Sequence, residues 1–149
     1  MDIWYTENHT DHVRMSMRVD KQLASVQSDF QRIDIFESVE FGRIMTLDGL
    51  LMLTEKDEYI YHEMITHIPM ATNPNIRDIL VIGAGDGGTV RELVRYPSIA
   101  HIDVVEIDEM VVELSKQYLP FTACGFDDPR VEIHIQDGLR FVRKVENAY

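Results

Sequence analysis

A glycine-rich loop constrains the fold of this chain more than any other feature. The loop, Gly83-Ala84-Gly85-Asp86-Gly87-Gly88, follows a short and almost uninterrupted apolar run, residues 77–82, and precedes a helical pattern over residues 88–96. Such an apolar run is typical of a parallel strand that is buried on both faces. A strand, a glycine turn and a helix in this order form the ligand-binding corner of an open α/β sheet. We therefore predict a nucleotide-type site at this loop.

The strand-then-helix pattern continues after the loop. Strands are predicted over residues 101–107 and 131–136, and helices over residues 109–119 and 139–145. This alternation predicts the first half of a doubly wound α/β sheet. The sequence ends where a fourth strand is expected, and an open half-sheet leaves backbone groups unpaired at its edge. We therefore expect a truncated sheet.

The residues before this pattern are predicted to form β-hairpins. Ile33 and Ile35 alternate with charged residues, which is the period of a half-buried strand. Residues 41–54 contain Asp48-Gly49, a pair that accepts the positive φ angles of a tight two-residue turn. A further strand region is expected over residues 15–26.

A helix is predicted to connect the two parts. Residues 54–57 supply capping and acidic side chains for its start. Apolar side chains then recur at helical spacing, namely Tyr61, Met64, Ile65 and Ile68. Pro69 and a following Asn-Pro-Asn turn are expected to end the helix. We therefore predict a β-hairpin domain with its connecting helix over residues 1–68, and a partial Rossmann-like nucleoside-binding domain over residues 69–149.

Composition limits the classes of partner. The 149 residues include 26 Asp and Glu against 14 Lys and Arg, which gives a formal net charge of −12. This charge disfavours nucleic acid, because phosphate contacts need clustered basic side chains. It would attract a polycation, or simply keep the protein soluble. We expect no membrane segment, since the apolar runs are too short, and the lone Cys124 and the lack of a signal peptide favour the cytoplasm.

Asp86 argues against a dinucleotide at the glycine loop. Read loosely, the loop satisfies G-x-G-x-x-G, and Glu106 ends the next predicted strand, where a carboxylate can bind both ribose hydroxyls. Asp86 would repel a pyrophosphate by about 4 kcal/mol, for unit charges about 4 Å apart at an effective dielectric constant of about 20. The loop instead suits an adenosyl group with a cationic tail, such as an adenosyl sulfonium. The alternative is an Asp that only caps the helix.

A third carboxylate is expected at the same edge of the sheet. Asp137-Gly138 follows the third predicted strand, where the carboxylate can accept a hydrogen bond from the exocyclic amine of adenine. Open α/β sheets bind ligands at the carboxyl ends of their strands, so Asp86, Glu106 and Asp137 are expected along one crevice. Taken alone, Asp137 is explained equally well as the cap of the next helix.

The motifs together resemble those of the spermidine synthase (polyamine aminopropyltransferase) family. The resemblance covers essentially the whole chain, and its most specific part is the Asp-Glu-x-x-Tyr-His-Glu-Met segment at residues 57–64. Further matching stretches are residues 47–49, 83–88, 106–108 and 128–138. The resemblance implies an α/β fold, with an N-terminal β-hairpin domain followed by the first half of a Rossmann-like, AdoMet-methyltransferase-type doubly wound sheet.

The resemblance also implies roles in binding the donor, decarboxylated S-adenosylmethionine. Gln31 would contact the nucleoside or its sulfur end, and Asp86 would hold the aminopropyl amine. Glu106 would bind the ribose hydroxyls, and Asp137 and Gly138 would bind adenine. The loop glycines would let the backbone approach the donor: Gly83, Gly85, Gly87 and Gly88. Ala84 stands where many members have a further glycine.

The acceptor side follows from the same resemblance. Tyr61 and His62, together with Asp86, would line the channel for the diamine. The catalytic Asp of the family lies in an Asp-Ser/Thr-x-Asp/Glu-Pro segment, expected about 5–6 residues beyond Tyr149. We therefore assign no catalytic residue to this chain and expect it to be inactive by itself. Family members are typically dimers or tetramers, so the resemblance implies a homodimer or homotetramer.

The implied reaction transfers the aminopropyl group to putrescine and gives spermidine and 5′-methylthioadenosine. It needs no metal or redox cofactor, because the sulfonium is already an activated leaving group. His62 and His67 lie about 140° apart on a helix, so they are not expected to share a metal ion, and no metal site is predicted.

Two other functions stay open at this point. A methyltransferase that uses S-adenosylmethionine would share the fold, the loop and Glu106, but Asp86 would oppose the carboxylate of that donor. The chain can also be a truncated, non-catalytic nucleotide-binding module. The acceptor stays open among putrescine, cadaverine, agmatine and spermidine.

Overall fold

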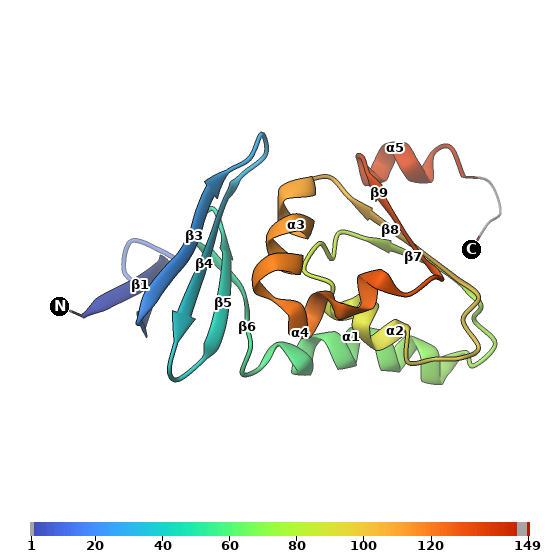
Figure 1. The fold of residues 1–149 in the computed structure, drawn as a ribbon, viewed down its shortest axis with the longest axis horizontal. Coiled ribbons are helices and arrows are strands. Elements are labelled where there is room, and N and C mark those ends of the chain that lie inside the picture. Colours follow the sequence, from blue (N-terminus) through green and yellow to red (C-terminus); the bar gives the residue numbers. More distant parts are fainter. Residues whose placement is uncertain (1, 146–148) are drawn as a thin grey trace. The chain divides into compact units, whose positions relative to one another are not determined.

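The chain folds into two compact units that divide between Glu58 and Tyr59. A computed structural model describes residues 2–145 and residue 149 (Figure 1). The predicted division at residues 68/69 falls inside a helix that belongs to the second unit. Each unit is described by itself below.

Antiparallel strands make up the first unit. Their bounds are β1 (Ile3–Asn8), β2 (Arg14–Val19), β3 (Lys21–Gln27), β4 (Arg32–Ser38), β5 (Gly42–Leu47) and β6 (Leu50–Thr54). β1 pairs with β2, and β3 to β6 form a meander in chain order. The strand region expected over residues 15–26 is divided at Asp20 between β2 and β3. The predicted tight turn is confirmed, because Asp48 and Gly49 have φ angles of 51° and 78°.

Glu7 joins β1 to the β5–β6 hairpin. Its Oε2 atom accepts hydrogen bonds from the Tyr5 hydroxyl at 3.1 Å and from the Leu51 amide at 2.8 Å. The Tyr5 hydroxyl also lies 2.9 Å from the carbonyl oxygen of Gly49. A buried cluster from both sheets packs beside this link: Tyr5, Met17, Val19, Phe36 and Ile44. The first unit therefore has its own apolar core.

Helix α1 (Glu58–Thr72) begins the second unit and continues through Pro69. A proline inside a helix removes the donor to the carbonyl of residue i−4 and crowds that carbonyl, which is why an end was expected at Pro69. The helix nevertheless runs on to Thr72, so the expected end is corrected. The prediction grouped this helix with the strands before it, whereas contacts group it with the sheet that follows.

The buried face of α1 is not the one that the apolar pattern predicts. His62, Thr66 and Met70 are buried, and they recur every four residues. The predicted apolar positions are exposed by about half of their surface: Tyr61 63%, Met64 56%, Ile65 46% and Ile68 53%. The helix thus packs a small and partly polar face on the rest of the second unit.

A parallel sheet with helices forms the rest of the second unit. Its elements are β7 (Asp78–Ile82), α2 (Gly88–Leu93), β8 (His101–Glu106), α3 (Glu109–Tyr118), α4 (Pro120–Ala123), the 3-10 turn η1 (Cys124–Asp127), β9 (Val131–Ile135) and α5 (Gly138–Val142). The strand order is β7-β8-β9, all parallel. The predicted α/β alternation is confirmed, and α4 and η1 are additions that the sequence did not predict.

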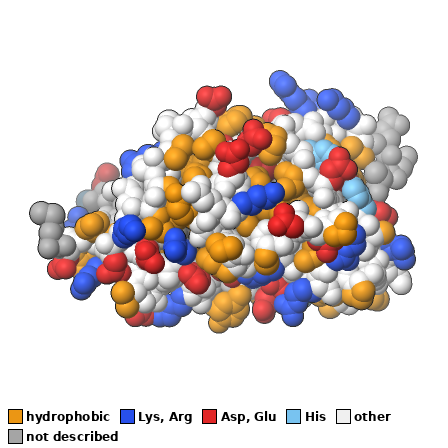
Figure 2. All heavy atoms as spheres, viewed as in Figure 1, with side chains coloured by type: hydrophobic (Ala, Val, Ile, Leu, Met, Phe, Trp, Pro, Cys, Tyr) orange, Lys and Arg blue, Asp and Glu red, His pale blue; other side chains and the backbone are white. Residues whose placement is uncertain are grey.

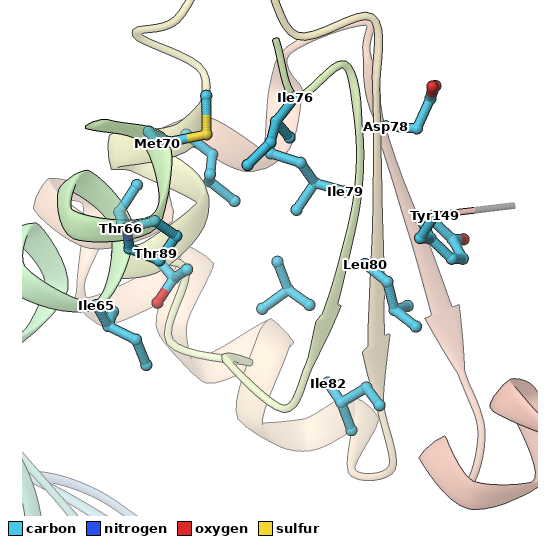
Figure 3. Close-up of a pocket in the computed structure, with 13 residues that line it drawn as sticks. Ile65, Thr66, Met70, Ile76, Asp78, Ile79, Leu80, Ile82, Thr89 and Tyr149 are labelled. Carbon is cyan, nitrogen blue, oxygen red and sulfur yellow. The ribbon is translucent and has the colours of Figure 1, made fainter. Parts of the chain in front are cut away.

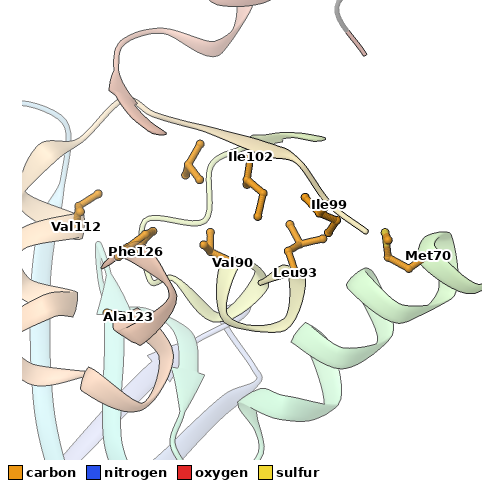
Figure 4. Packing of buried hydrophobic residues seen from close by; sticks show 9 residues of the cluster. Met70, Val90, Leu93, Ile99, Ile102, Val112, Ala123 and Phe126 are labelled. Atoms are coloured by element: carbon orange, nitrogen blue, oxygen red, sulfur yellow. The ribbon is translucent and has the colours of Figure 1, made fainter. Parts of the chain in front are cut away.

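One face of this sheet carries the apolar core. Figure 4 shows Val90 and Leu93 of α2 facing Ile102 of β8, with Phe126 alongside. β8 is buried, but β7, the strand predicted to be buried on both faces, is only half-buried, and its last residue, Ile82, is 57% exposed. β7 is less buried than β8 because it lies at an edge of the described sheet, where a strand pairs on one side. No helix among the described residues is long and apolar enough to cross a membrane.

A groove of about 520 Å³ follows the free edge of β7. Figure 3 shows Ile79 of β7 pointing toward α1, which carries Ile65 and Met70, whereas Leu80 points to the other side of the strand, toward Tyr149. Charged side chains of both signs are interspersed over the face of the molecule in Figure 2. The polar site of the second unit lies at the carboxyl ends of the strands.

Candidate active site at the glycine loop

The glycine loop turns sharply between β7 and α2 with left-handed backbone. Gly83, Ala84 and Gly87 have φ angles of 80°, 71° and 85°. The amide of Gly83 donates to the carbonyl of Val105 on β8 at 2.8 Å. A Cβ atom on Gly85 would lie 2.9 Å from Glu106 Oε2, so only glycine allows this close approach. The loop is thereby held against the end of β8.

Ala84 adopts a conformation that costs an L-residue about 1–2 kcal/mol. Ala84→Gly is therefore expected to raise the free energy of unfolding, by up to about 1 kcal/mol after the added entropy of the unfolded chain is subtracted. Urea unfolding measures this change. The control is Ala123→Gly, where φ is −76° and the same substitution should destabilise. A lower free energy of unfolding for Ala84→Gly would contradict the claim that the backbone of Ala84 is strained.

Glu106 anchors the loop from the end of β8. The residue is 8% exposed, and its Oε1 atom accepts from the amides of Ile107 at 2.8 Å and Asp108 at 3.1 Å. Its Oε2 atom accepts from the amide of Gly85 at 3.1 Å. A carboxylate has about four acceptor positions, so these amides orient the group and leave capacity on Oε2.

Asp86 and His62 form a contact at the start of α2. His62 Nε2 lies 3.2 Å from Asp86 Oδ1, and the amide of Gly88 donates to the same oxygen at 2.7 Å. Burial alone would raise the pKa of Asp86, but the hydrogen bond and charge of His62, with the backbone amide bonds, lower it overall. Asp86 is therefore a carboxylate at neutral pH. Asp86 also fulfils the alternative role, that of a helix cap, because it accepts the hydrogen bond from the Gly88 amide at the start of α2.

Gly88 makes room for the ring of His62. A Cβ atom at this position would lie 2.3 Å from both Cε1 and Nδ1 of that ring. Only a residue without a side chain therefore lets α1 approach α2 at this point. This explains why α1 buries His62 instead of its apolar stripe.

Asp137 and Gly138 lie at the same edge of the sheet, after β9. Asp137 Oδ1 accepts from the amide of Arg140 at 2.8 Å, so the residue caps α5. A Cβ atom on Gly138 would lie 2.5 Å from Ile82 Cγ2 at the end of β7. The ends of β7, β8 and β9 therefore meet here, and they bring the carboxylates of Asp86, Glu106 and Asp137 to one edge.

The remaining predicted site residues lie elsewhere. Tyr61 is 63% exposed on α1, and its ring touches the edge of the His62 ring at a centroid distance of 5.3 Å. Gln31 belongs to the first unit, in the turn before β4, where its backbone amide donates a hydrogen bond to Ser28 Oγ at 3.1 Å. It is described within that unit only.

Asp108 is a residue that the site prediction left out. It is 1% exposed and caps α3 by accepting from the amide of Met110 at 3.1 Å. Its backbone amide also binds Glu106. An Asp placed just before a helical pattern is a recognisable capping signal, which was available in the sequence.

Comparison with known proteins identifies the family that shares this arrangement. Residues 58–149 match the model of the spermine/spermidine synthase domain, and residues 3–55 match that of the spermidine synthase tetramerisation domain. The chain belongs to the spermine/spermidine synthase family. The predicted family and fold class are therefore confirmed.

Individual relatives are similar along the whole chain. Polyamine aminopropyltransferases from Alkaliphilus oremlandii and Clostridium perfringens are each 66% identical over 149 residues, which cover 100% of this chain and 52% and 53% of theirs. The crystal structure of spermidine synthase from Thermotoga maritima matches with a TM-score of 0.95 and 47% identity, over 97% of this chain and 51% of that one. The chain thus spans about half the length of these relatives.

A further solved structure carries a ligand. It is a spermidine synthase in complex with the transition-state analogue AdoDATO, and it matches with a TM-score of 0.95 at 47% identity, again over 51% of that chain. The spermine/spermidine synthase fold thus accommodates an analogue of the transition state in that relative.

Proposed function

We propose that this chain is the donor-binding half of a polyamine aminopropyltransferase. The observation that carries the proposal is the Asp86 carboxylate, which His62 and the glycine loop hold beside the buried Glu106. A fixed negative charge at this place suits the cationic aminopropyl sulfonium of decarboxylated S-adenosylmethionine. It opposes the carboxylate of S-adenosylmethionine itself, which disfavours the methyltransferase alternative.

Glu106 binds the ribose in this proposal. Its backbone contacts fix the carboxylate, and the free capacity on Oε2 accepts a ribose hydroxyl. Asp137 and Gly138 receive the adenine, because Gly138 keeps the backbone close to the end of β7. Gly83, Gly85 and Gly87 give the loop the shape that lets the donor approach. The assignment of Gln31 to the nucleoside rests on the family resemblance alone.

His62 acts through Asp86. Because its ring is 3% exposed and contacts Oδ1 of Asp86, it holds the carboxylate ionised and in place. Asp86 then aligns the aminopropyl chain for attack by the acceptor, which is a matter of near-attack geometry. The exposed Tyr61 lines the path of the diamine.

The chemical step is a direct displacement. A neutral primary amine attacks the methylene beside the sulfonium, the carbon–sulfur bond breaks, and 5′-methylthioadenosine leaves with the bonding electrons. A free alkylamine has a pKa near about 10.4, so a base must take its proton. The proposal places that base in the half of the relatives that this chain does not span. The co-substrate is decarboxylated S-adenosylmethionine, putrescine is the favoured acceptor, and the strands of residues 3–55 assemble a tetramer.

Binding of 5′-methylthioadenosine to the 149-residue chain tests the donor site. Glu106→Gln should weaken the affinity at least about tenfold, because a hydrogen bond to a charged group contributes about 1.5–3 kcal/mol. Glu109→Gln is the matched control, since Glu109 is exposed in the first turn of α3. Equal affinities of the two variants, both shown to be folded by circular dichroism, would contradict the site.

Turnover tests the proposed activity. We expect the protein extended to the length of its relatives to release 5′-methylthioadenosine from decarboxylated S-adenosylmethionine and putrescine. The 149-residue chain should bind the product with negligible turnover. Robust turnover by the 149-residue chain would show that the base lies within it.

A further inference from the structure

A second polar cluster lies on the neighbouring parallel strands β8 and β9. His101 and Asp103 are two residues apart on β8 and therefore point to the same face of the sheet. Glu132 of β9 is paired with Asp103, and His134 is two residues further along β9. The core residues of these strands, such as Ile102 and Val104, occupy the intervening positions and face the other way. The cluster thus lies on the face that the apolar core does not use.

The distances within the cluster are those of a ligand set. One ligand atom each from His101, Asp103 and Glu132 lies within 4.8 Å of the other two. Asp103 Oδ1 lies 3.1 Å from His101 Nε2 and 2.6 Å from His134 Nε2, and His134 Nε2 lies 3.9 Å from Glu132 Oε1. Zinc with bonds of about 2.0–2.2 Å in a tetrahedron places its ligand atoms roughly 3.3–3.5 Å apart. His101, Asp103 and Glu132 thus have the spacing of a ligand set, and His134 joins them if it exchanges its hydrogen bond to Asp103 for the ion.

Neighbouring side chains orient these groups. The Tyr149 hydroxyl donates to Asp103 Oδ2, which leaves Oδ1 directed at the two imidazoles. The His134 ring packs against Phe141 at a centroid distance of 5.0 Å. Contacts of this kind fix the orientation of ligating side chains in metal sites. Figure 2 shows histidine side chains beside an acidic one on the surface of the molecule, and the side chains of His101 and Glu132 are 41% and 63% exposed.

We propose that His101, Asp103, Glu132 and His134 bind a divalent transition-metal ion, with zinc the best match. Two imidazole nitrogens and two carboxylate oxygens suit zinc, whereas magnesium and calcium prefer oxygen ligands alone. The ion would link β8 to β9 and stabilise the sheet. Its ligating side chains lie on β8 and β9 before the strand ends that carry the glycine-loop site, so the ion takes no part in the proposed aminopropyl transfer. The sequence pattern does not indicate this site, because its residues recur at strand spacing on two strands and not at helical spacing on one helix.

Titration of the chelator-treated chain with zinc and cobalt tests this site. We expect one ion per chain by calorimetry, and a visible absorption spectrum of tetrahedral cobalt that zinc abolishes. Zinc should raise the melting temperature, because an ion that binds only the folded chain stabilises it. Magnesium should produce neither effect.

Substitution of single histidines distinguishes zinc binding at this cluster from zinc binding at other histidines. His101→Gln and His134→Gln should each weaken zinc binding at least tenfold, whereas His12→Gln, an exposed histidine of the first unit, should bind like the parent chain. The affinity for 5′-methylthioadenosine should be the same with and without zinc. Wild-type affinity in both cluster variants, or no zinc binding by the folded parent chain, would overturn the proposal.

Discussion

Arg130→Ala is expected to destabilise the chain by about 3 kcal/mol or more. The guanidinium donates to both carboxylate oxygens of Asp128, at 2.9 Å and 2.8 Å. It also donates to the carbonyls of Val94 at 2.6 Å, Tyr96 at 2.8 Å and Ile99 at 3.3 Å. Each hydrogen bond to a charged group contributes about 1.5–3 kcal/mol, and truncation leaves several carbonyls without a donor. Arg130 thus ties the start of β9 to the segment between α2 and β8.

Urea unfolding measures this loss. Arg130→Lys should give most of the same effect, because an ammonium cannot replace a planar fork of donors. Arg140→Ala is the control, since that side chain is exposed on α5, and it should change the free energy of unfolding by less than about 0.5 kcal/mol. Equal effects of Arg130→Ala and Arg140→Ala would show that the Arg130 contacts do not stabilise the fold.

The Arg130 contact should also depend on pH. Hydrogen bonds from Arg130 lower the pKa of Asp128 to about 2. A lowered carboxyl pKa stabilises the folded state above the unfolded value, about 3.9, and this stabilisation is lost as the pH falls toward the folded value. We therefore expect the stability difference between the parent chain and Arg130→Ala to shrink between pH 4 and pH 2. A difference that stays constant over this range would contradict the assignment.

Gly88→Ala is expected to have the second large effect. The new Cβ atom would lie 2.3 Å from the His62 ring, so the ring must move away from Asp86. Overpacking of this kind costs about 1–3 kcal/mol. Donor affinity should fall at least tenfold as well, because Asp86 loses the partner that holds it. Thermal unfolding and binding of decarboxylated S-adenosylmethionine measure the two effects.

A double variant separates the clash from other causes. His62→Ala removes the ring, so Gly88→Ala should cost much less stability in that background than in the parent chain. Donor affinity should stay low in the double variant, since His62 is still missing. If Gly88→Ala cost the same in both backgrounds, its effect would come from the helix backbone and not from His62.

The sequence predicted the parallel sheet and the edge where the site lies. Alternating strands and helices, with a glycine loop after the first strand, leave few other arrangements, and this explains why Glu106 and Asp137 were placed correctly at strand ends. The pattern could not show that three backbone amides already bind Glu106. Those contacts depend on the path of the loop, which Ala84 and Gly85 shape through their backbone.

The packing of α1 could not be read from periodicity. The apolar stripe with Met64 and Ile68 predicts the buried face, yet the face with His62 is buried because Gly88 accommodates its ring. Burial of β7 was overestimated for a related reason, since a strand with an apolar sequence is covered only where a neighbouring element lies against it. Both outcomes depend on contacts between distant segments.

The central claim is that Asp86 selects a cationic donor. Its most direct test compares the affinities of decarboxylated S-adenosylmethionine and S-adenosylmethionine for the parent chain and for Asp86→Asn. We predict at least a tenfold preference for the decarboxylated donor in the parent chain, and a preference close to one in Asp86→Asn. Asp137→Asn should weaken both donors equally. Equal affinities in the parent chain, or an unchanged preference in Asp86→Asn, would contradict the account.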